Sequence, residues 1–198
     1  MKTRVLIMTL MTATILVALT GCSNHDGNEW ERLVCEVESV NGGSPLLSAY
    51  AEIGNDNVAG TSDDVYTVDW VPVVFRARPY SSSIYLPEDG VQSWFHVTSY
   101  DLTWTPLGNA PATLTDHNIV GGLVDVRVPV NEDAAGSVLI ADRVLKDQPW
   151  FITELAVNGS SFTANCQLTF YGHESGNSRE VAVQGGFMVT FYGYVSDN

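Results

Sequence analysis

The residues best suited to metal chemistry lie in a short acidic stretch between residues 54 and 64. This stretch carries five side chains with oxygen ligands around a central glycine, Gly60. Calcium binds hard oxygen ligands of this kind, and a glycine lets the backbone fold around the ion. The same composition also produces a solvated turn without any metal, because Asn, Asp and Gly favour turns. The candidate calcium ligands are Asn55, Asp56, Asn57, Asp63 and Asp64.

The chain has no motif that is typical of an enzyme site. Its four histidines form no HExxH or HxH pattern, so we expect no zinc site. His96 lies on an apolar strand face, where a hydrogen-bonded core histidine is expected. There is no G-x-S-x-G elbow, no P-loop and no dinucleotide-binding glycine motif. We therefore expect no catalytic residues, although a triad assembled from distant residues would leave no such motif.

Four aromatic residues are predicted to face away from the core. Exposed rings supply apolar area with a polar tip, which suits the binding of a sugar or a peptide. The alternative is that these rings cover strand ends or pack under a loop. The candidate ligand-binding residues are Trp70, Tyr171, Tyr192 and Tyr194.

The three cysteines are Cys22, Cys35 and Cys166. If Cys22 carries a lipid anchor, Cys35 and Cys166 remain as an even pair, which is typical of a disulfide in an oxidising compartment. Such a bridge would stabilise the fold by at most about 5 kcal/mol. The alternative is two separate buried thiols.

The N-terminus has the features of a secretory signal. Lys2 and Arg4 precede an apolar run over residues 5–19, which is shorter than the about 20 apolar residues that a membrane-spanning helix needs. The run ends in Leu19-Thr20-Gly21-Cys22, which resembles the lipobox of bacterial lipoproteins. The resemblance implies cleavage before Cys22 and acylation of its sulfur and new amine, enough for stable anchoring. A plain secretory peptide with an ordinary thiol at Cys22 is the alternative.

The same resemblance implies a location and a domain organisation. Ser23 follows Cys22, and an aspartate there would resemble the inner-membrane retention signal of lipoproteins; its absence implies the outer membrane. Residues 1–21 are then a signal peptide, residues 22–31 a lipidated polar tether, and residues 32–198 one domain.

Composition excludes some partners. The formal charge is −14 and becomes −16 without the signal, because Lys2 and Arg4 leave with it. Arg76 and Arg78 are the closest pair of cations in the rest of the chain. Binding to a phosphate backbone needs several clustered cations, so we expect no nucleic-acid partner. A polybasic grip on anionic lipid is excluded for the same reason.

Alternating apolar and polar residues predict seven to eight strands. Such alternation places one face of each strand in the core and the other towards solvent. The predicted strands cover residues 33–38, 46–53, 71–78, 93–104, 124–130, 138–145, 161–170 and 180–191.

Several local features refine these strands. Pro72 restricts its strand to a sheet edge or to the start of the strand. The residues Trp94, His96, Tyr100, Leu102 and Trp104 are predicted to share one face. Gly185 and Gly186 predict a bulge, residues 131–136 a turn, and residues 150–157 a short helix across one end.

The pattern predicts an all-β fold, a single antiparallel β-sandwich. The segments 71–104 and 170–194 are similar to immunoglobulin-like β-sandwich domains in uncharacterised bacterial lipoproteins. The Cys-Trp-Cys spacing typical of true immunoglobulin domains is not matched.

These features lead to an expected function. We expect an outer-membrane lipoprotein whose domain is a non-catalytic binding or scaffolding module, with an envelope protein or a glycan as its partner. The alternatives are a glycan-binding accessory module that uses the tyrosines, and a small envelope hydrolase.

Overall fold

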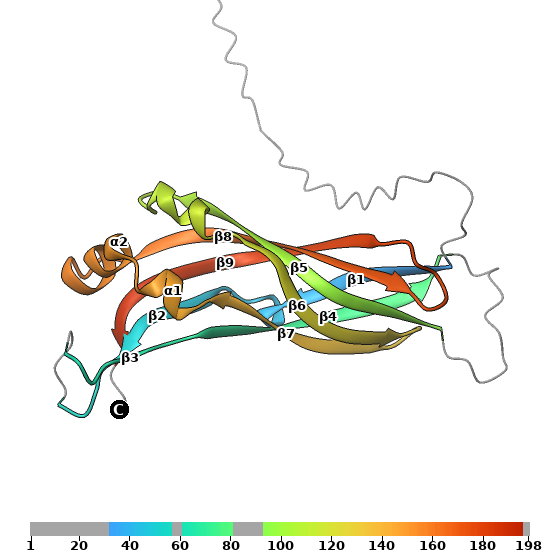
Figure 1. The fold of residues 1–198 in the computed structure, drawn as a ribbon, viewed down its shortest axis with the longest axis horizontal. Coiled ribbons are helices and arrows are strands. Elements are labelled where there is room, and N and C mark those ends of the chain that lie inside the picture. Colours follow the sequence, from blue (N-terminus) through green and yellow to red (C-terminus); the bar gives the residue numbers. More distant parts are fainter. Residues whose placement is uncertain (1–31, 57–60, 81–92, 196–198) are drawn as a thin grey trace, which may run out of the picture.

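The computed structural model describes residues 32–56, 61–80 and 93–195. These residues form an all-β protein with two sheets and short helices at one end (Figure 1). The described strands are β1 (Leu33–Val40), β2 (Leu46–Glu52), β3 (Val65–Tyr66), β4 (Asp69–Pro79), β5 (Trp94–Leu107), β6 (Ile119–Pro129), β7 (Asp133–Ala141), β8 (Phe162–Glu174) and β9 (Val181–Val195). The helical segments are η1 (Asn41–Gly43), η2 (Ala112–His117), α1 (Arg143–Lys146), α2 (Pro149–Ile152) and η3 (Thr153–Val157).

The two sheets differ in size. The smaller sheet has the order β1-β4-β7, and the larger has the order β3-β2-β9-β8-β5-β6. The first two strands divide between them: β1 pairs antiparallel with β4, whereas β2 pairs parallel with β9. The chain therefore changes sheets at η1, and the β2–β9 pair departs from the predicted antiparallel arrangement.

The core lies between the facing sides of the two sheets. The alternation predicted for β8 and β9 is confirmed, because Cys166, Leu168, Phe170, Val189 and Phe191 are all buried. From the smaller sheet, β4 contributes Val71, Val73, Phe75 and Ala77, each with no exposed surface. Phe75 meets Phe170 edge to face, with ring centroids 4.9 Å apart, so the aromatic rings interdigitate between the layers.

The strand β5 corrects one prediction. Phe95 and Val97 point into the core, and so do Tyr100, Leu102 and Trp104. A register shift between Val97 and Ser99 inserts one extra residue opposite β8, and this bulge reverses the alternation. Trp94 and His96 therefore lie on the outer face, and the predicted core histidine is wrong.

The local predictions for Gly185-Gly186 and for Pro72 have different outcomes. Pairing continues without a shift through Gly185 and Gly186, so no bulge forms there. A Cβ on Gly185 would lie 2.8 Å from Val37, so this glycine allows β1 to approach β9 closely. β4 is the central strand of its sheet rather than an edge, but Pro72 lies near its start, before the pairing with β1 at Val73, so the second of the two predicted placements is confirmed.

The region between β6 and α2 is organised differently from the prediction. β7 already begins at Asp133, within the predicted turn over residues 131–136. It ends at Ala141, and residues 143–146 form α1 instead of continuing the strand. The helix predicted over residues 150–157 is confirmed, because α2 and η3 together cover it. These helices close the end of the sandwich opposite the start of β1 (Figure 1).

Candidate functional site

The first described residue, Arg32, is bound to Glu174, which is distant in sequence and ends β8. The backbone N–H and Nε of Arg32 both donate to the carboxylate of Glu174, at 2.9 and 2.7 Å. Its Nη2 also donates to the carbonyl of Ser175. Glu174 is only 4% exposed and ends β8. A buried carboxylate needs such a partner, so this ion pair attaches the start of the domain to the larger sheet.

Next to this ion pair, five side chains on the outer face of the larger sheet form what we call the His-Trp cluster. His96 and His173 are directly opposite each other on β5 and β8, with ring centroids 5.4 Å apart. The ring of Trp94 lies 5.7 Å from that of His96, and the Arg127 guanidinium lies over the Trp94 ring at 5.2 Å. The fifth member is Asp125, whose Oδ1 lies 2.6 Å from Nε2 of His96, within hydrogen-bonding distance.

The chemistry of this cluster is that of a cation-bearing aromatic surface. The electron-rich face of the Trp94 indole ring attracts the positively charged guanidinium of Arg127. Asp125 is 86% exposed in its side chain, whereas that of His96 is only 20% exposed. The cluster thus presents a charged, hydrogen-bonding surface held in place by ring packing.

Sequence reasoning missed the cluster for two physical reasons. The bulge in β5 moved His96 to the outer face, and the pairing of β5 with β8 joins residues that are distant in sequence. A directly opposite pair such as His96 and His173 becomes visible only when the strand register is known.

A second polar group is entirely internal. Lys146 has no exposed surface, and its Nζ contacts the carboxylate of Asp69 at 2.8 Å. The same Nζ donates to the carbonyl of Ala49 and to the hydroxyl of Thr67. The hydroxyl of Ser48 donates to Asp69 Oδ2, the same oxygen that Nζ of Lys146 contacts. Burial lowers the pKa of Lys146, and the carboxylate of Asp69 opposes this effect. The three contacts of Nζ form a structural network that joins α1, β2 and β4.

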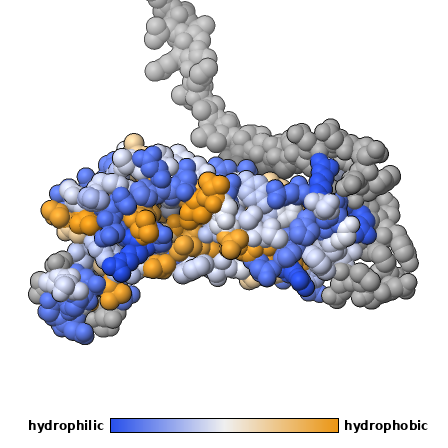
Figure 2. All heavy atoms as spheres, in the orientation of Figure 1, coloured by the Kyte–Doolittle hydropathy of each residue, from blue (hydrophilic) through white to orange (hydrophobic). Residues whose placement is uncertain are grey.

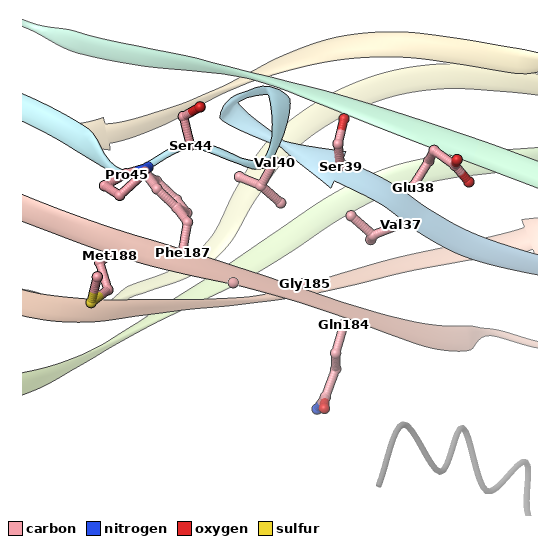
Figure 3. Close-up of a pocket in the computed structure, with 12 residues that line it drawn as sticks. Val37, Glu38, Ser39, Val40, Ser44, Pro45, Gln184, Gly185, Phe187 and Met188 are labelled. Atoms are coloured by element: carbon pink, nitrogen blue, oxygen red, sulfur yellow. The ribbon is translucent and has the colours of Figure 1, made fainter. Parts of the chain in front are cut away.

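A groove of about 400 Å³ lies where β1 passes over β9. Within the described strands, β2 covers β9 only from Val189 onwards, so the edge of residues 181–188 is left open beside the groove. Figure 3 shows Val37 and Val40 on the β9 side of β1 and Phe187 turned towards Pro45, while Gln184 points away. An open strand edge beside apolar side chains is the geometry used in recognition by strand addition.

The predicted calcium ligands are only partly described, because Asn57 lies outside the described residues. Asp64 accepts hydrogen bonds from the backbone N–H groups of Gly54 and Thr61, and Asp63 accepts one from that of Asp56. A hydrogen bond from the Thr61 hydroxyl is the main reason that the pKa of Asp63 is held below its ordinary value. The carboxylates of Asp63 and Asp64 therefore stabilise the turn by hydrogen bonds to its backbone N–H groups, as expected for a turn without a metal.

The structure does not bring the four predicted aromatic residues together. Trp70 is 60% exposed on β4 of the smaller sheet, whereas the three tyrosines belong to the larger sheet. Tyr171 is paired with Ala182, ten residues from Tyr192 along β9, or about 33 Å at the usual rise of a strand. Tyr171 also donates to Asp101 Oδ2 at 2.9 Å, which raises the pKa of Tyr171.

Tyr194 is a correction to the predicted outward set. Its ring packs edge to face on the buried Tyr50, with centroids 5.4 Å apart, and it belongs to the margin of the core. A binding platform of all four rings is therefore wrong, and Tyr194 follows the alternative in which a ring covers the end of a strand.

The cysteine prediction is also corrected, because Cys35 and Cys166 are buried free thiols and no bridge joins them. The contact between Arg32 and Glu174 fixes the two strands lengthwise. Cys35 lies three residues from Arg32 and Cys166 lies eight residues from Glu174, which separates them by about 16 Å along the strands. A disulfide needs Cα atoms within about 7 Å.

Three further observations concern metal ligands, membrane-spanning helices and the apolar surface. Among the described residues, no three or more His, Cys, Asp or Glu side chains form a group that could hold a metal ion. Of the helices in the described part of the chain, none is long and apolar enough to cross a membrane. Figure 2 shows apolar side chains over the middle and the α1 half of one face, whereas the end where the described chain begins is mostly hydrophilic.

Comparison with known proteins leaves the chain without an assigned family. No family model matches it, and no curated protein matches it. Among solved structures, it is similar to AggA, the major subunit of aggregative adherence fimbriae type I from Escherichia coli. The identity is 7%, the match covers 84% of this chain and 99% of AggA, and the TM-score is 0.29. A TM-score this low defines neither the fold nor the function of this chain.

Proposed function

We propose that this protein is a lipid-anchored protein of the bacterial outer membrane whose β-sandwich is a non-catalytic binding or scaffolding module. The anchor is the lipidated Cys22 at the end of Leu19-Thr20-Gly21-Cys22. Two or more acyl chains on one residue hold a protein stably on a membrane.

The observation that carries the proposal is the ion pair between Arg32 and Glu174. Arg32 lies ten residues after Cys22, and its backbone and side chain are both bound to the buried carboxylate. A ten-residue connection reaches at most about 35 Å. An anchor at Cys22 would thus hold one end of the sandwich close to the membrane and leave its sheet faces available to a partner.

The sheet order supports an immunoglobulin-like type of sandwich. In that fold, strands A, B and E form one sheet and strands G, F and C form the other, which an additional C′ strand can extend. Here β1-β4-β7 corresponds to the first set, and β9-β8-β5-β6 corresponds to the second. Domains of this architecture have many functions, so the function is argued from surfaces rather than from the fold.

The hydrogen bonding of the buried polar groups supports a non-catalytic role. Ser48 donates to Asp69, and Lys146 uses all its protons in the same network, so neither is paired as a nucleophile with a histidine base. The groove between β1 and β9 supports a binding role, since it combines an open strand edge with apolar side chains.

Replacement of Cys22 tests the anchor. The Cys22→Ala variant should be unprocessed or soluble, whereas the wild-type protein should carry acyl mass on Cys22 and require detergent. A variant of mature size that still requires detergent would reject the lipid anchor.

Selection of peptides tests the binding role. Peptides selected from a random library on the detergent-solubilised protein should bind less tightly to Met188→Asp at the groove. They should bind normally to Leu123→Asp, a matched change of an exposed apolar residue on β6. Equal binding to both variants would place recognition elsewhere.

A glycan array with Tyr192→Ala as control tests the glycan-binding alternative, and a broad hydrolase screen at high protein concentration tests the envelope hydrolase. Binding to one sugar class that is lost in Tyr192→Ala would replace the present proposal by the first alternative. Turnover of any substrate class would replace it by the second.

Calcium binding at residues 54–64 stays a prediction. Calorimetric titration should show binding in the millimolar range or tighter if the carboxylates of Asp63 and Asp64 act as ligands. An Asp63→Asn variant should then lose that heat. Absence of heat in the wild-type protein would leave the hydrogen-bonded turn as the role of these residues.

A further inference from the structure

The two halves of β9 bury their core-facing side chains to different extents. Val189 and Phe191 have no exposed surface, and there β2 runs beside β9. Val181, Val183 and Phe187 face the same side of the strand but are only half-buried. Pairing of β9 with β8 continues without a register shift through both halves, so no change of face explains the difference. The difference follows instead from the other edge of β9, which no described strand covers before Val189.

The path of the chain leaves this edge uncovered. β2 begins its pairing with β9 only at Leu46. The residues just before β2 form η1, and β1 pairs with β4 in the smaller sheet instead of continuing along β9. We call the resulting opening the β9 slot, which consists of the open edge of residues 181–188 and the adjacent side chains of Val37, Val40 and Pro45. An edge of this length measures about 26 Å at the usual rise of a strand.

The chemistry of the slot suits an extended backbone. An uncovered strand edge presents N–H and C=O groups, which another strand satisfies by continuing the sheet. Val37, Val40 and Phe187 supply apolar surface beside this edge (Figure 3). Gly185 and Gly186 lie near the middle of the slot, where they leave the β9 backbone free of side chains. Strand addition combines these two features, main-chain hydrogen bonds and pockets for alternate side chains.

Charge and sequence distinguish between the candidate sources of this strand. The formal charge of −14 becomes −16 once the two cations of the signal segment are removed, and a second copy with the same charge is repelled. The tether over residues 22–31 lacks the alternating apolar residues that a strand needs. Glu38 at the groove lies 4.0 Å from Arg76, so the attraction for cations comes from the domain as a whole. A separate protein with a basic extended segment therefore fits the slot best.

We propose that the β9 slot takes up, as an added strand, an extended segment of a basic envelope protein. The segment pairs with residues 181–188 and places apolar side chains at alternate positions over Val183 and Phe187. Lysine or arginine occupies the positions between them, which face outwards. This inference rests on the binding role of the proposed function and names the kind of partner. It continues an existing pairing, because β2 covers the same edge from Val189 onwards.

Two synthetic peptides test the binding and its dependence on charge. Each has eight residues and carries fluorescein; one alternates valine with lysine, and the other alternates valine with glutamate. Fluorescence anisotropy with the detergent-solubilised acylated protein should show tighter binding of the lysine peptide, by a margin that shrinks as salt is added. A third peptide has the lysines and the valines in two separate blocks and should bind more weakly. Equal binding of the alternating and the block peptide would overturn recognition as a strand.

Methylation of the peptide backbone tests strand pairing itself. The N–H groups of alternate residues in a strand point to the same edge, so N-methylation of either the valines or the lysines blocks one edge and keeps every charge. Only one of the two methylated peptides should lose binding, by about tenfold or more, because only one edge meets β9. The peptide that loses binding identifies the direction of the added strand. Equal behaviour of the two methylated peptides would overturn the proposal.

A gain of binding tests the position of the added strand on β9. Gln184 is exposed on the outer face of the slot, where a lysine of the added strand lies beside it. Gln184→Glu should therefore tighten binding of the lysine peptide about two- to fivefold. Gln167→Glu is the matched control, because Gln167 is exposed on β8, one strand further from the slot. An equal gain in both variants would contradict pairing along residues 181–188.

The binding role and the choice of partner fail in different ways. If neither the library peptides nor the lysine peptide bind, the binding role of the proposed function is wrong as well. If library peptides bind at the groove but the lysine peptide does not, the binding role holds and the basic partner is wrong. Tight binding of the glutamate peptide would have the same meaning. The melting temperature of each variant, measured without peptide, separates changes in binding from changes in folding.

Discussion

The hydroxyl of Tyr100 donates a hydrogen bond to the carbonyl oxygen of Leu139 at 3.0 Å, and this bond connects the two sheets. Tyr100 belongs to β5 of the larger sheet and Leu139 to β7, the edge strand of the smaller one. The ring passes so close to Gly122 that a Cβ there would lie 2.5 Å from it. The glycine in β6 thus leaves room for a tyrosine that satisfies a carbonyl at the open edge of β7.

Replacement of Tyr100 by Phe should destabilise the protein by about 1–2 kcal/mol, because the Leu139 carbonyl loses its donor while the ring packing is kept. Urea unfolding measures the change. Tyr80→Phe is the control, because Tyr80 is 57% exposed and should contribute little. Equal stability of the two variants would show that the inter-sheet bond contributes nothing net.

Removal of Lys146 should have a larger effect. Lys146→Met leaves the carboxylate of Asp69 without its main partner, and such losses of one member of a buried pair cost about 3–5 kcal/mol. The double variant Lys146→Met, Asp69→Leu should regain part of that loss, since apolar replacement of a buried pair is often neutral. Thermal or urea unfolding of Lys146→Met, Asp69→Leu and the double variant measures the coupling, and strictly additive losses would contradict it.

How far the sequence predicts this fold depends on whether the determining contacts are local. The alternation in β8 and β9 predicts their buried faces correctly, because period two is a property of one strand. The faces of Trp94 and His96 could not be predicted, because the bulge after Val97 appears only when β5 is paired. The parallel pairing of β2 with β9 likewise joins residues that no local pattern relates.

The candidate sites divide in the same way. The lipobox is a contiguous motif and can be recognised from four residues. The bond between Arg32 and Glu174 joins residues 142 positions apart, and nothing in either neighbourhood signals the other. Lys146 lies in a segment with the pattern of a strand end, and its burial follows only from the contact of α1 with Asp69.

The cysteines should behave as two slowly reacting thiols. Cys35 and Cys166 are buried, and burial is the main cause that raises the pKa of both, that of Cys35 to about 12. The thiolate is the reactive form, so Ellman's reagent should react slowly with the native acylated protein and with two thiols after denaturation. Mass spectrometry of the non-reduced protein would contradict this if it found Cys35 linked to Cys166.

The same two thiols predict a loss of stability at alkaline pH. Their pKa values in the folded protein are raised above the ordinary value of 9.0, so the unfolded chain releases these protons first. Their contribution to stability is therefore complete below about pH 9 and decreases as the pH rises towards 12. Urea unfolding at a series of pH values measures the slope, and a Cys35→Ala, Cys166→Ala variant should show a smaller one.

Gly185 should be needed for the approach of β1 to β9. In Gly185→Ala, the added methyl group would lie 2.8 Å from a methyl carbon of Val37 and 3.1 Å from one of Val40. Overpacking of this kind costs about 1–3 kcal/mol, and it should also change the shape of the groove that these residues line. Urea unfolding of the single variant measures the cost.

A second substitution separates this clash from other effects of the methyl group. Val37→Ala removes the side chain closest to the new methyl, so the double variant Gly185→Ala, Val37→Ala should be more stable than the sum of the two single losses implies. Gly185 is not among the glycines with a positive φ, so its backbone conformation does not require glycine. Backbone strain in the strand would therefore not explain such a rescue. Additive losses would therefore show that β1 moves aside freely, and that the close contact at Gly185 does not define the groove.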